Sequence, residues 1–260
     1  GFISPTGIAI DANGNLLVAD AGNNLVKRMD TLGGNITILG SGFNAPYGVA
    51  VDADGNIYVA DSNNNAIKKM NSLGDNIVTL GTGFSAPHAV AVDATGTIFV
   101  ADYNNNAIKK MDASGGNITI IGSGFNRPIG VSLDADGKIY VADFINNSVK
   151  RMDADGSNII TLGTGFYMPT CVRIDASGAV FVSDINSSPV KKLTFPSYSI
   201  TPTLPVGLIF NPATGTISGT PTVGSPLTTY TISTLNLCGT NDATVTFATC
   251  APFNPTITIT

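Results

Sequence analysis

The feature that most constrains the fold is a 41-residue repeat that covers residues 1–195 of the 260-residue chain. Residues 46–70, PYGVAVDADGNIYVADSNNNAIKKM, recur five times without drift. The first proline of the repeat lies at Pro5, Pro46, Pro87, Pro128 and Pro169. The aspartate that closes its V-A-D or V-S-D step lies at Asp20, Asp61, Asp102, Asp143 and Asp184. An unbroken period of this length indicates one supersecondary unit that buries its apolar faces against the next copy.

Each repeat contains four short segments that are typical of β-strands. In the second copy, residues 48–51 and 57–60 are apolar and rich in β-branched side chains, and residues 66–70 and 77–80 follow after loops. Asp52 and Gly55 mark a tight hairpin turn between the first two segments. No segment has the apolar period of a helix. Four strands in a meander predict the blade of a β-propeller, so the expected fold class is all-β.

The residues of the repeat also resemble a known family. The pattern G-F-x-x-P-x-G-[IV]-A-[IV]-D-A-x-G-N-[IL]-[YL]-V-A-D-x-x-N-N-x-[IV]-K is similar to the NHL repeat over residues 1–194. This resemblance implies a β-propeller, and propellers of the family most often have six blades. The family includes enzymes, protein- and RNA-binding platforms and bacterial surface or sensor domains, so the resemblance predicts the fold better than the function.

Five blades are visible in the sequence, and the fifth lacks its own outer strand. Its third strand ends near Phe195, and the sequence that follows has no counterpart of the fourth strand. A bare third strand exposes an edge that invites pairing with another segment. The resemblance implies that a propeller closes with a strand from the other terminus, so residues before Gly1 are expected to supply it. Residues 255–260, PTITIT, are a weaker match to that strand.

The character of the chain changes at residue 196, where the repeat ends and threonine and proline become frequent. Short strand-like segments between turns predict a small β-sandwich. Residues 204–221, LPVGLIFNPATGTISGTP, resemble the signature of an immunoglobulin-like domain of bacterial surface proteins, and the resemblance covers about residues 196–250. We therefore expect a propeller at 1–195 and, at 196–260, an Ig-like sandwich with the start of a following segment. The resemblance implies a spacer or adhesion unit in a secreted protein.

Composition argues against two kinds of partner. Charged residues make up 12% of the chain and its net charge is −5, whereas a nucleic-acid partner requires a clustered basic face. No run of about 18 apolar residues is present, so insertion into a membrane is not expected. Basic pairs such as Lys68 and Lys69 recur on every third strand, and one pair per blade predicts a solvated outer rim. The chain begins with glycine and has no signal peptide, as expected of a mature chain or an excerpt.

Little in the sequence indicates catalysis, and no cofactor or metal is expected. His88 is the only histidine, which excludes a zinc site built from several histidines. No G-x-S-x-G nucleophile elbow is present. The D-x-D-G segments at Asp52, Asp134 and Asp153 resemble the start of a calcium loop but lack its closing glutamate, so they are interpreted as hairpin turns. Because some NHL-like propellers are enzymes, an extracellular hydrolase or lyase acting at the central channel is the alternative to a binding module.

Two cysteines near the C-terminus raise the question of a disulfide. A hairpin with its turn at residues 239–242 places Cys250 opposite Tyr230, roughly 20 Å from Cys238 along the strands and beyond bridging distance. A bridge therefore requires a different strand layout. Cys171 takes the place of a glycine on a first strand and is expected to be a small buried side chain.

Loop positions that differ between blades predict a binding surface. In a four-stranded meander, the loop before the first strand and the loop between the second and third strands lie at the same end of the blade. These positions carry aromatic, histidine and arginine side chains, which are the usual anchors of binding surfaces. The predicted site, a shallow one around the channel mouth, consists of Tyr47, His88, Tyr103, Arg127, Phe144 and Tyr167. The alternative interpretation is sequence drift in loops that the scaffold tolerates.

Arg173 is the one charge on an inner strand, where the other blades carry Ala9, Ala50, Ala91 and Ser132. It either binds an anion at the channel or fills looser packing at the closure seam of the ring. The sequence as a whole predicts a fragment of a secreted or cell-surface bacterial protein that serves as a non-catalytic binding, adhesion or structural module. Its expected partners are a protein or a glycan on a surface, or neighbouring domains of the same long chain.

Overall fold

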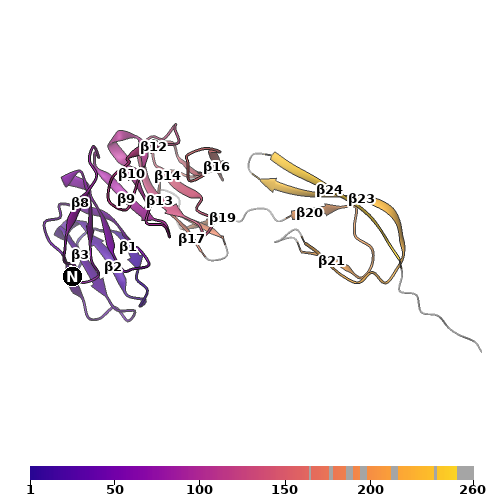
Figure 1. Ribbon diagram of the computed structural model, residues 1–260, viewed down its shortest axis with the longest axis horizontal. Helices are drawn as coiled ribbons and strands as arrows, with labels where there is room; N and C mark the ends of the chain where they lie inside the picture. The colour runs from indigo at the N-terminus through magenta and orange to yellow at the C-terminus, as the bar shows by residue number, and fades with distance from the viewer. Residues whose placement is uncertain are drawn as a thin grey trace, which may run out of the picture. The chain divides into compact units, whose positions relative to one another are not determined.

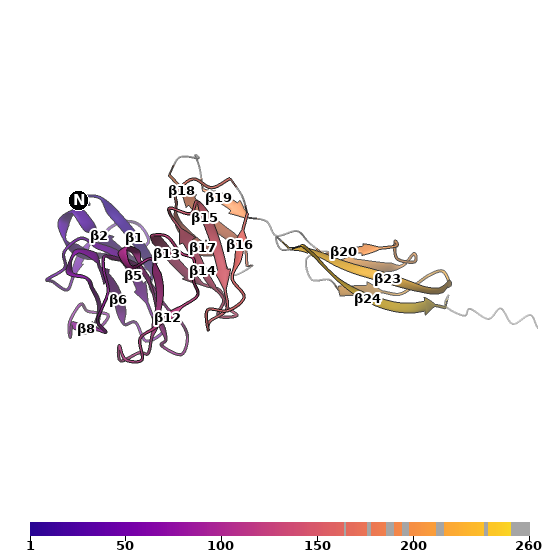
Figure 2. The same ribbon diagram turned by 90° about the horizontal axis from the view of Figure 1, so that it is seen from above.

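The chain forms two compact units, Gly1–Leu193 and Thr194–Thr260. The computed structural model describes residues 1–163, 165–175, 178–185, 190–193, 198–211, 216–236 and 239–250. Figures 1 and 2 show the strands of both units, coloured along the chain. The first unit ends two residues before the predicted boundary at residue 195.

The described residues of the first unit form five antiparallel sheets in which consecutive strands are neighbours. The first sheet comprises β1 (Pro5–Ile10), β2 (Leu16–Asp20), β3 (Leu25–Met29) and β4 (Thr37–Leu39). The second comprises β5 (Pro46–Val51), β6 (Ile57–Asp61), β7 (Ala66–Met70) and β8 (Val78–Leu80). The third comprises β9 (Pro87–Val92), β10 (Ile98–Asp102), β11 (Ala107–Met111) and β12 (Thr119–Ile121).

The last two sheets continue this order. The fourth comprises β13 (Pro128–Leu133), β14 (Ile139–Asp143), β15 (Ser148–Met152) and β16 (Ile160–Leu162). The fifth comprises β17 (Pro169–Ile174), β18 (Val180–Asp184) and β19 (Lys191–Leu193). Short 3-10 turns follow the second strands of the first three sheets, as η1 (Ala21–Asn23), η2 (Ser62–Asn64) and η3 (Tyr103–Asn105).

The D-x-D-G segments are hairpin turns, and Asp52 shows why. One oxygen of its carboxylate accepts the backbone N–H groups of Asp54 and Asn56, at 3.1 and 2.8 Å. The other oxygen accepts the side-chain amide of Asn56 and the hydroxyl of Tyr58. Gly55 has a φ of 82°, a left-handed conformation that costs glycine little. Donors within the turn therefore bond to both carboxylate oxygens. The hairpin turn alone accounts for the presence of aspartate and glycine at these positions.

The five sheets are the blades of one propeller. The first strands β1, β5, β9, β13 and β17 pack side by side in this order, and all five line a single central cavity. A methyl group added at Gly48 would lie 2.7 Å from the carbonyl oxygen of His88, so neighbouring first strands approach too closely there for a side chain. Figure 1 shows successive sheets following one another along the chain. The prediction of five blades about one axis is confirmed.

The apolar core lies in layers between neighbouring blades. Between the second and third blades, Tyr58, Ile67 and Leu80 pack against Val90 and Ile98, and all five side chains are buried. Corresponding clusters join the first blade to the second, the third to the fourth and the fourth to the fifth. Each blade therefore contributes one apolar face to each neighbour, as the repeat predicts.

The two end blades differ from the inner ones. Ile8 on β1 is 53% exposed, whereas Val49 at the same position of β5 is 3% exposed, because the first blade covers β5. At the other end, β19 is the last strand of a three-stranded sheet. Residues 198–201 do not extend that sheet, since they form β20, which pairs with β23 in the second unit. Within the described residues the fifth blade therefore has three strands, as predicted.

The second unit is a small Ig-like β-sandwich, with two sheets in the part of it that the structure describes. Its strands are β20 (Tyr198–Thr201), β21 (Leu208–Asn211), β22 (Thr216–Gly219), β23 (Ser225–Asn236) and β24 (Gly239–Thr249). β20, β23 and β24 form one sheet, and β21 and β22 form the other. The ring of Tyr230, which is 2% exposed, stacks on Phe247 with 4.7 Å between centroids. The described part of the chain contains no helix long and apolar enough to cross a bilayer.

The predicted hairpin near the C-terminus has the wrong register. Val245 lies opposite Tyr230, and Gly239 lies opposite Asn236. Residues 239–242 therefore belong to β24 rather than to a turn, because the pairing of β23 with β24 continues as far as Asn236 and Gly239. Cys238 itself lies outside the described residues, and Cys250 is an exposed free thiol beyond the far end of β24. Cys171 is half-buried rather than fully buried.

Candidate binding face

The two loops predicted to share one end of the blade lie side by side. In the second blade, the backbone N–H groups of Ser62 and Asn63 donate to the carbonyl oxygens of Ala45 and Asn44. In the third and fourth blades, Asn104 and Ile145 donate in the same way to Ser85 and Asn126. The loop before each first strand is therefore fixed to the loop between the second and third strands, and we call this end of the propeller the loop face.

Asparagines join the loop face of one blade to that of the next. Asn106 adopts a left-handed conformation with a φ of 52°. Its side-chain oxygen accepts the backbone N–H of Arg127 in the following blade, at 2.8 Å. Asn24, Asn65 and Asn147 make the same contact with the residues before the next prolines, which are Ala45, Ala86 and Met168. These links position the variable side chains of successive blades relative to one another.

Five of the predicted site residues meet on the loop face. The rings of Tyr47 and His88 lie 4.4 Å apart between centroids, and those of His88 and Tyr103 stack at 4.1 Å. The rings of Tyr103 and Phe144 lie 6.4 Å apart. The guanidinium of Arg127 lies over the ring of Tyr103, 5.5 Å from its centroid, in a cation–π contact. We call these four rings and Arg127 the aromatic row, which crosses the second, third and fourth blades.

His88 lies in the middle of the row, and its burial favours the neutral form of the imidazole. Its Nδ1 lies 2.8 Å from the carbonyl oxygen of Ala86, and since a carbonyl only accepts, Nδ1 carries the proton. Burial lowers the pKa of His88 below its usual 6.5, and the contact with Ala86 opposes this shift without reversing it. A neutral ring stacks between Tyr47 and Tyr103 without burying a charge.

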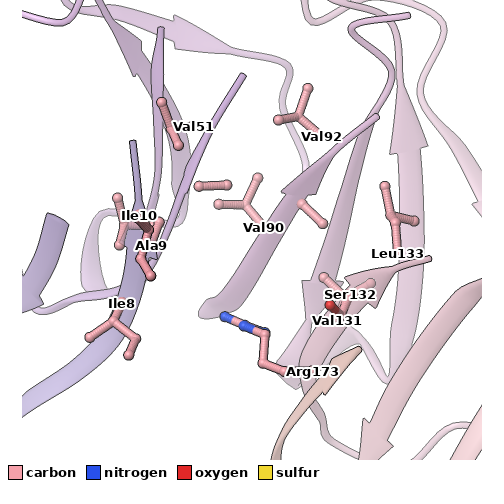
Figure 3. Close-up of a pocket in the computed structure, with 13 residues that line it drawn as sticks. Ile8, Ala9, Ile10, Val51, Val90, Val92, Val131, Ser132, Leu133 and Arg173 are labelled. Atoms are coloured by element: carbon pink, nitrogen blue, oxygen red, sulfur yellow. The ribbon is translucent and has the colours of Figure 1, made fainter. Parts of the chain in front are cut away.

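The remaining two predicted residues lie elsewhere. Tyr167 is 49% exposed, its backbone N–H donates to Asp184, and no ring contact joins it to the aromatic row in the described residues. Arg173 lines the central cavity together with aliphatic residues of the other first strands (Figure 3). Its position four residues after Pro169 places it inside the strand, away from the loop face. The structure therefore brings five of the seven predicted residues together, and Tyr167 and Arg173 lie apart from them.

A buried ion pair below the loop face was missed by sequence reasoning. In the third blade the carboxylate of Asp102, which is 0% exposed, accepts the backbone N–H of Ser85 and the side-chain amide of Asn105. Lys109 lies 2.7 Å from the same carboxylate, donates to the carbonyl of Gly83 and sits over a phenylalanine ring. The same pairing recurs as Lys27–Asp20, Lys68–Asp61, Lys150–Asp143 and Lys191–Asp184.

The expected solvated rim of basic pairs is therefore wrong for the first lysine of each pair. The side chain of Lys109 is 11% exposed because the buried carboxylate draws it inward. The second member of a pair lies against neighbouring groups instead, as Lys69 does over the ring of Tyr58. The constant seven-residue spacing from aspartate to lysine was the available signal, since it recurs in every blade.

Comparison with family models agrees with this geometry. A model of the NHL repeat matches residues 2–29, 43–70, 84–111 and 125–152. The first unit is an NHL-repeat β-propeller. A second model, described as "Putative Ig domain", matches residues 169–249 and so begins within the fifth blade of the propeller. We assign residues 169–193 to the propeller because β17 packs beside β13 and both line the same cavity.

The chain also resembles solved structures. A chain of a nidogen–laminin complex matches with a TM-score of 0.68 and 21% identity, covering 72% of this chain and 74% of that one. Catalytically inactive virginiamycin B lyase from Staphylococcus aureus with quinupristin matches with a TM-score of 0.62 and 17% identity, covering 94% and 80%. A streptogramin B lyase gives 0.61 and 17%, covering 92% and 82%. At these identities the likeness shows the fold alone. No curated protein matches the chain.

Proposed function

We propose that this chain is a non-catalytic binding module of an extracellular bacterial protein, and that the aromatic row contacts a protein partner. The observation that carries the proposal is the continuous contact of four rings and one guanidinium from three successive blades. Tyrosine and arginine are enriched among the few residues that dominate protein interfaces. Side chains that already pack against one another lose little freedom on binding, so the row is preorganised for a partner.

The stacking geometry favours a protein over a glycan. A sugar ring packs on an open aromatic face, but His88 and Tyr103 cover one face of each other at 4.1 Å. The ring of Tyr47 and the guanidinium of Arg127 add further cover. The row therefore offers ring edges, the hydroxyls of Tyr47 and Tyr103 and the donors of Arg127, which suit the mixed polar and apolar surface of a protein.

Charge favours an acidic partner. Apart from the five buried aspartates, every aspartate of the propeller lies in a hairpin turn at the end opposite the loop face. Arg127 on the loop face is exposed, and no carboxylate of the described residues lies within ion-pair distance of it. A negatively charged protein surface is therefore repelled by one end of the propeller and attracted by the other. Such asymmetry orients a partner during its approach.

Two findings support an extracellular protein partner. The second unit matches an Ig-like family, and such domains are common in the surface proteins that the sequence resembles. The propeller shares its fold with a chain from a nidogen–laminin complex, an assembly of proteins. In this proposal the Ig-like unit is a spacer that carries the propeller.

The proposal is tested by capture of surface proteins on the immobilised full chain. Replacing Tyr47, Tyr103 and Phe144 together by alanine removes three rings of the row. The matched control replaces Leu32 and Leu73, which are 95% and 69% exposed at the far end, by alanine. We expect the wild-type chain and the control to retain a protein that the triple variant loses. A captured protein that the wild-type chain, the triple variant and the control retain equally would overturn the assignment of a protein partner. Binding to a glycan array by the wild-type chain and the control, but not by the triple variant, would overturn it as well.

An extracellular lyase is the second candidate, because two structures that share the fold are lyases. One of them was solved as a catalytically inactive histidine-to-alanine variant. His88 is the single histidine of this chain, and no partner of its Nε2 is found among residues 1–163. Liquid chromatography measures the conversion of quinupristin by the full chain. Conversion by the wild-type chain that His88→Ala abolishes would support the lyase. Unchanged quinupristin supports the binding module over this alternative.

A further inference from the structure

Arg127 and Phe144 lie at one end of the aromatic row and both belong to the fourth blade. The residues next to them in the chain are joined by a hydrogen bond, which the backbone N–H of Ile145 donates to the carbonyl oxygen of Asn126 at 3.1 Å. The backbone N–H of Arg127 donates in turn to the side chain of Asn106 in the third blade, at 2.8 Å. The two side chains therefore extend from loops whose backbones are fixed to each other.

The guanidinium of Arg127 lies on the ring of Tyr103 and keeps its hydrogen-bond donors free. Arg127 is exposed, and its guanidinium is 5.5 Å from the centroid of that ring. In the part of the chain that the structure describes, it has no ion pair and its side chain donates no hydrogen bond. A guanidinium that stacks on a ring can still bind a carboxylate through two N–H groups in its own plane.

Phe144 is the least enclosed ring of the row. His88 lies between Tyr47 and Tyr103, with 4.4 and 4.1 Å between centroids. Phe144 has one ring neighbour among the described residues, Tyr103, at 6.4 Å and with a tilt of 50°. Its side chain is half-buried. The wider spacing at this end of the row leaves ring surface that an apolar or aromatic side chain of a partner can cover.

We propose that the fourth blade selects the partner, by binding an acidic residue at Arg127 and a large apolar or aromatic residue at Phe144 within one short segment of that partner. This inference rests on the proposed function. Both groups lie within 6.4 Å of the same ring, that of Tyr103. Two side chains on one side of an extended segment are about 7 Å apart, which is a separation of the same size.

The apolar contact strengthens the ionic one. An ion pair that stays exposed to water contributes little to binding. A partner side chain that covers Phe144 excludes water from the carboxylate beside it, as the surroundings of dominant interface residues commonly do. The two contacts are therefore expected to depend on each other.

The combination of a charge and a ring occurs in the fourth blade alone, so the segment has one place on the row. At the positions equivalent to Arg127 and Phe144, the other blades carry Ser4 and Ala21, Ala45 and Ser62, Ala86 and Tyr103, and Met168 and Ile185.

The test selects binders of the immobilised full chain from a library of short random peptides displayed on phage. We expect the selected peptides to carry aspartate or glutamate within two residues of phenylalanine, tyrosine, tryptophan or leucine. Arg127→Ala and Phe144→Ala should each weaken a selected peptide by about tenfold or more. The matched control is Arg173→Ala, which removes another exposed arginine, away from the loop face, and should leave binding unchanged.

Charge reversal separates a direct ion pair from an indirect effect of Arg127. Arg127→Glu should lose the selected peptide and bind a version of it in which lysine replaces the acidic residue. If Arg127 served only to hold the neighbouring rings in place, Arg127→Glu would not prefer the lysine version.

The outcomes distinguish this inference from the proposed function. Selected peptides that lack an acidic residue, or that bind Arg127→Ala as tightly as wild type, would overturn the inference and leave the protein partner in place. If no peptide is selected, the row does not bind a single short segment, which also overturns it. Peptides that bind equally well when Tyr47, Tyr103 and Phe144 are all alanine would instead count against the aromatic row as the binding surface.

Discussion

The loop face and the blade interior of the propeller differ in how far their residues vary from one repeat to the next. In the interior, the ion pair of Asp102 and Lys109 has a counterpart in every blade. On the loop face, the residue after the first proline changes from Thr6 to Tyr47 to His88 while the backbone around it stays the same. Residues that recur in every blade stabilise it. Positions that vary on a constant backbone are not required for that stability, so their side chains can bind a partner.

The largest effect is expected from breaking a repeated contact. Asp102→Ala leaves Lys109, which is 11% exposed, as a buried charge without its carboxylate, so we expect a loss of about 3–5 kcal/mol in the free energy of unfolding. Asp184→Ala in the fifth blade should cost less, because its partner Lys191 is 29% exposed. Chemical denaturation of the two variants measures both losses. Equal losses of unfolding free energy in the two variants would show that burial of the lysine does not determine the contribution of the ion pair.

A smaller effect is expected where the same position is covered in one blade and open in another. Val131→Ala removes methyl groups from a side chain that is 2% exposed, and about 2 kcal/mol of unfolding free energy should be lost. Ile8→Ala acts at the equivalent position of β1, which is 53% exposed, and should cost less than about 1 kcal/mol. Denaturation curves distinguish the two. A large loss for Ile8→Ala would mean that another segment covers β1 in solution.

The smallest effect on stability is expected from titrating His88. Its pKa is lowered in the folded protein, so the unfolded chain binds a proton first as the pH falls below about 6.5. Stability should therefore decline between pH 6.5 and the lowered pKa, by at most about 1.4 kcal/mol per pH unit, and level off below it. His88→Phe, which keeps a ring in the row, should abolish this decline. Thermal unfolding from pH 7 to pH 5 measures it.

The fold could be predicted from the sequence because the repeat has no drift. The period and the turn residues together predict the blades. The lack of a fourth strand-like segment after Phe195 predicts the three-stranded sheet of the fifth blade. The meeting of Tyr47, His88 and Tyr103 followed from meander topology, which places their two loops at one end.

Other features required coordinates. Lysine next to lysine on a strand is normally solvated, and the constant spacing from aspartate to lysine does not by itself show that Lys68 turns back to Asp61. Tyr167 sits two residues before its proline, where the backbone bonds to Asp184 and the ring does not reach the row. The register of the last hairpin depends on the length of its turn, which composition does not specify.

The central claim, that a partner lies on the aromatic row, is tested most directly by photo-cross-linking. A benzophenone amino acid replaces Phe144 in one variant of the full chain and Leu73, at the far end of the second blade, in another. After irradiation with the captured surface protein, we expect a covalent adduct from position 144 and none from position 73. An adduct from position 73 alone would contradict the assignment and move the partner to the opposite end of the propeller.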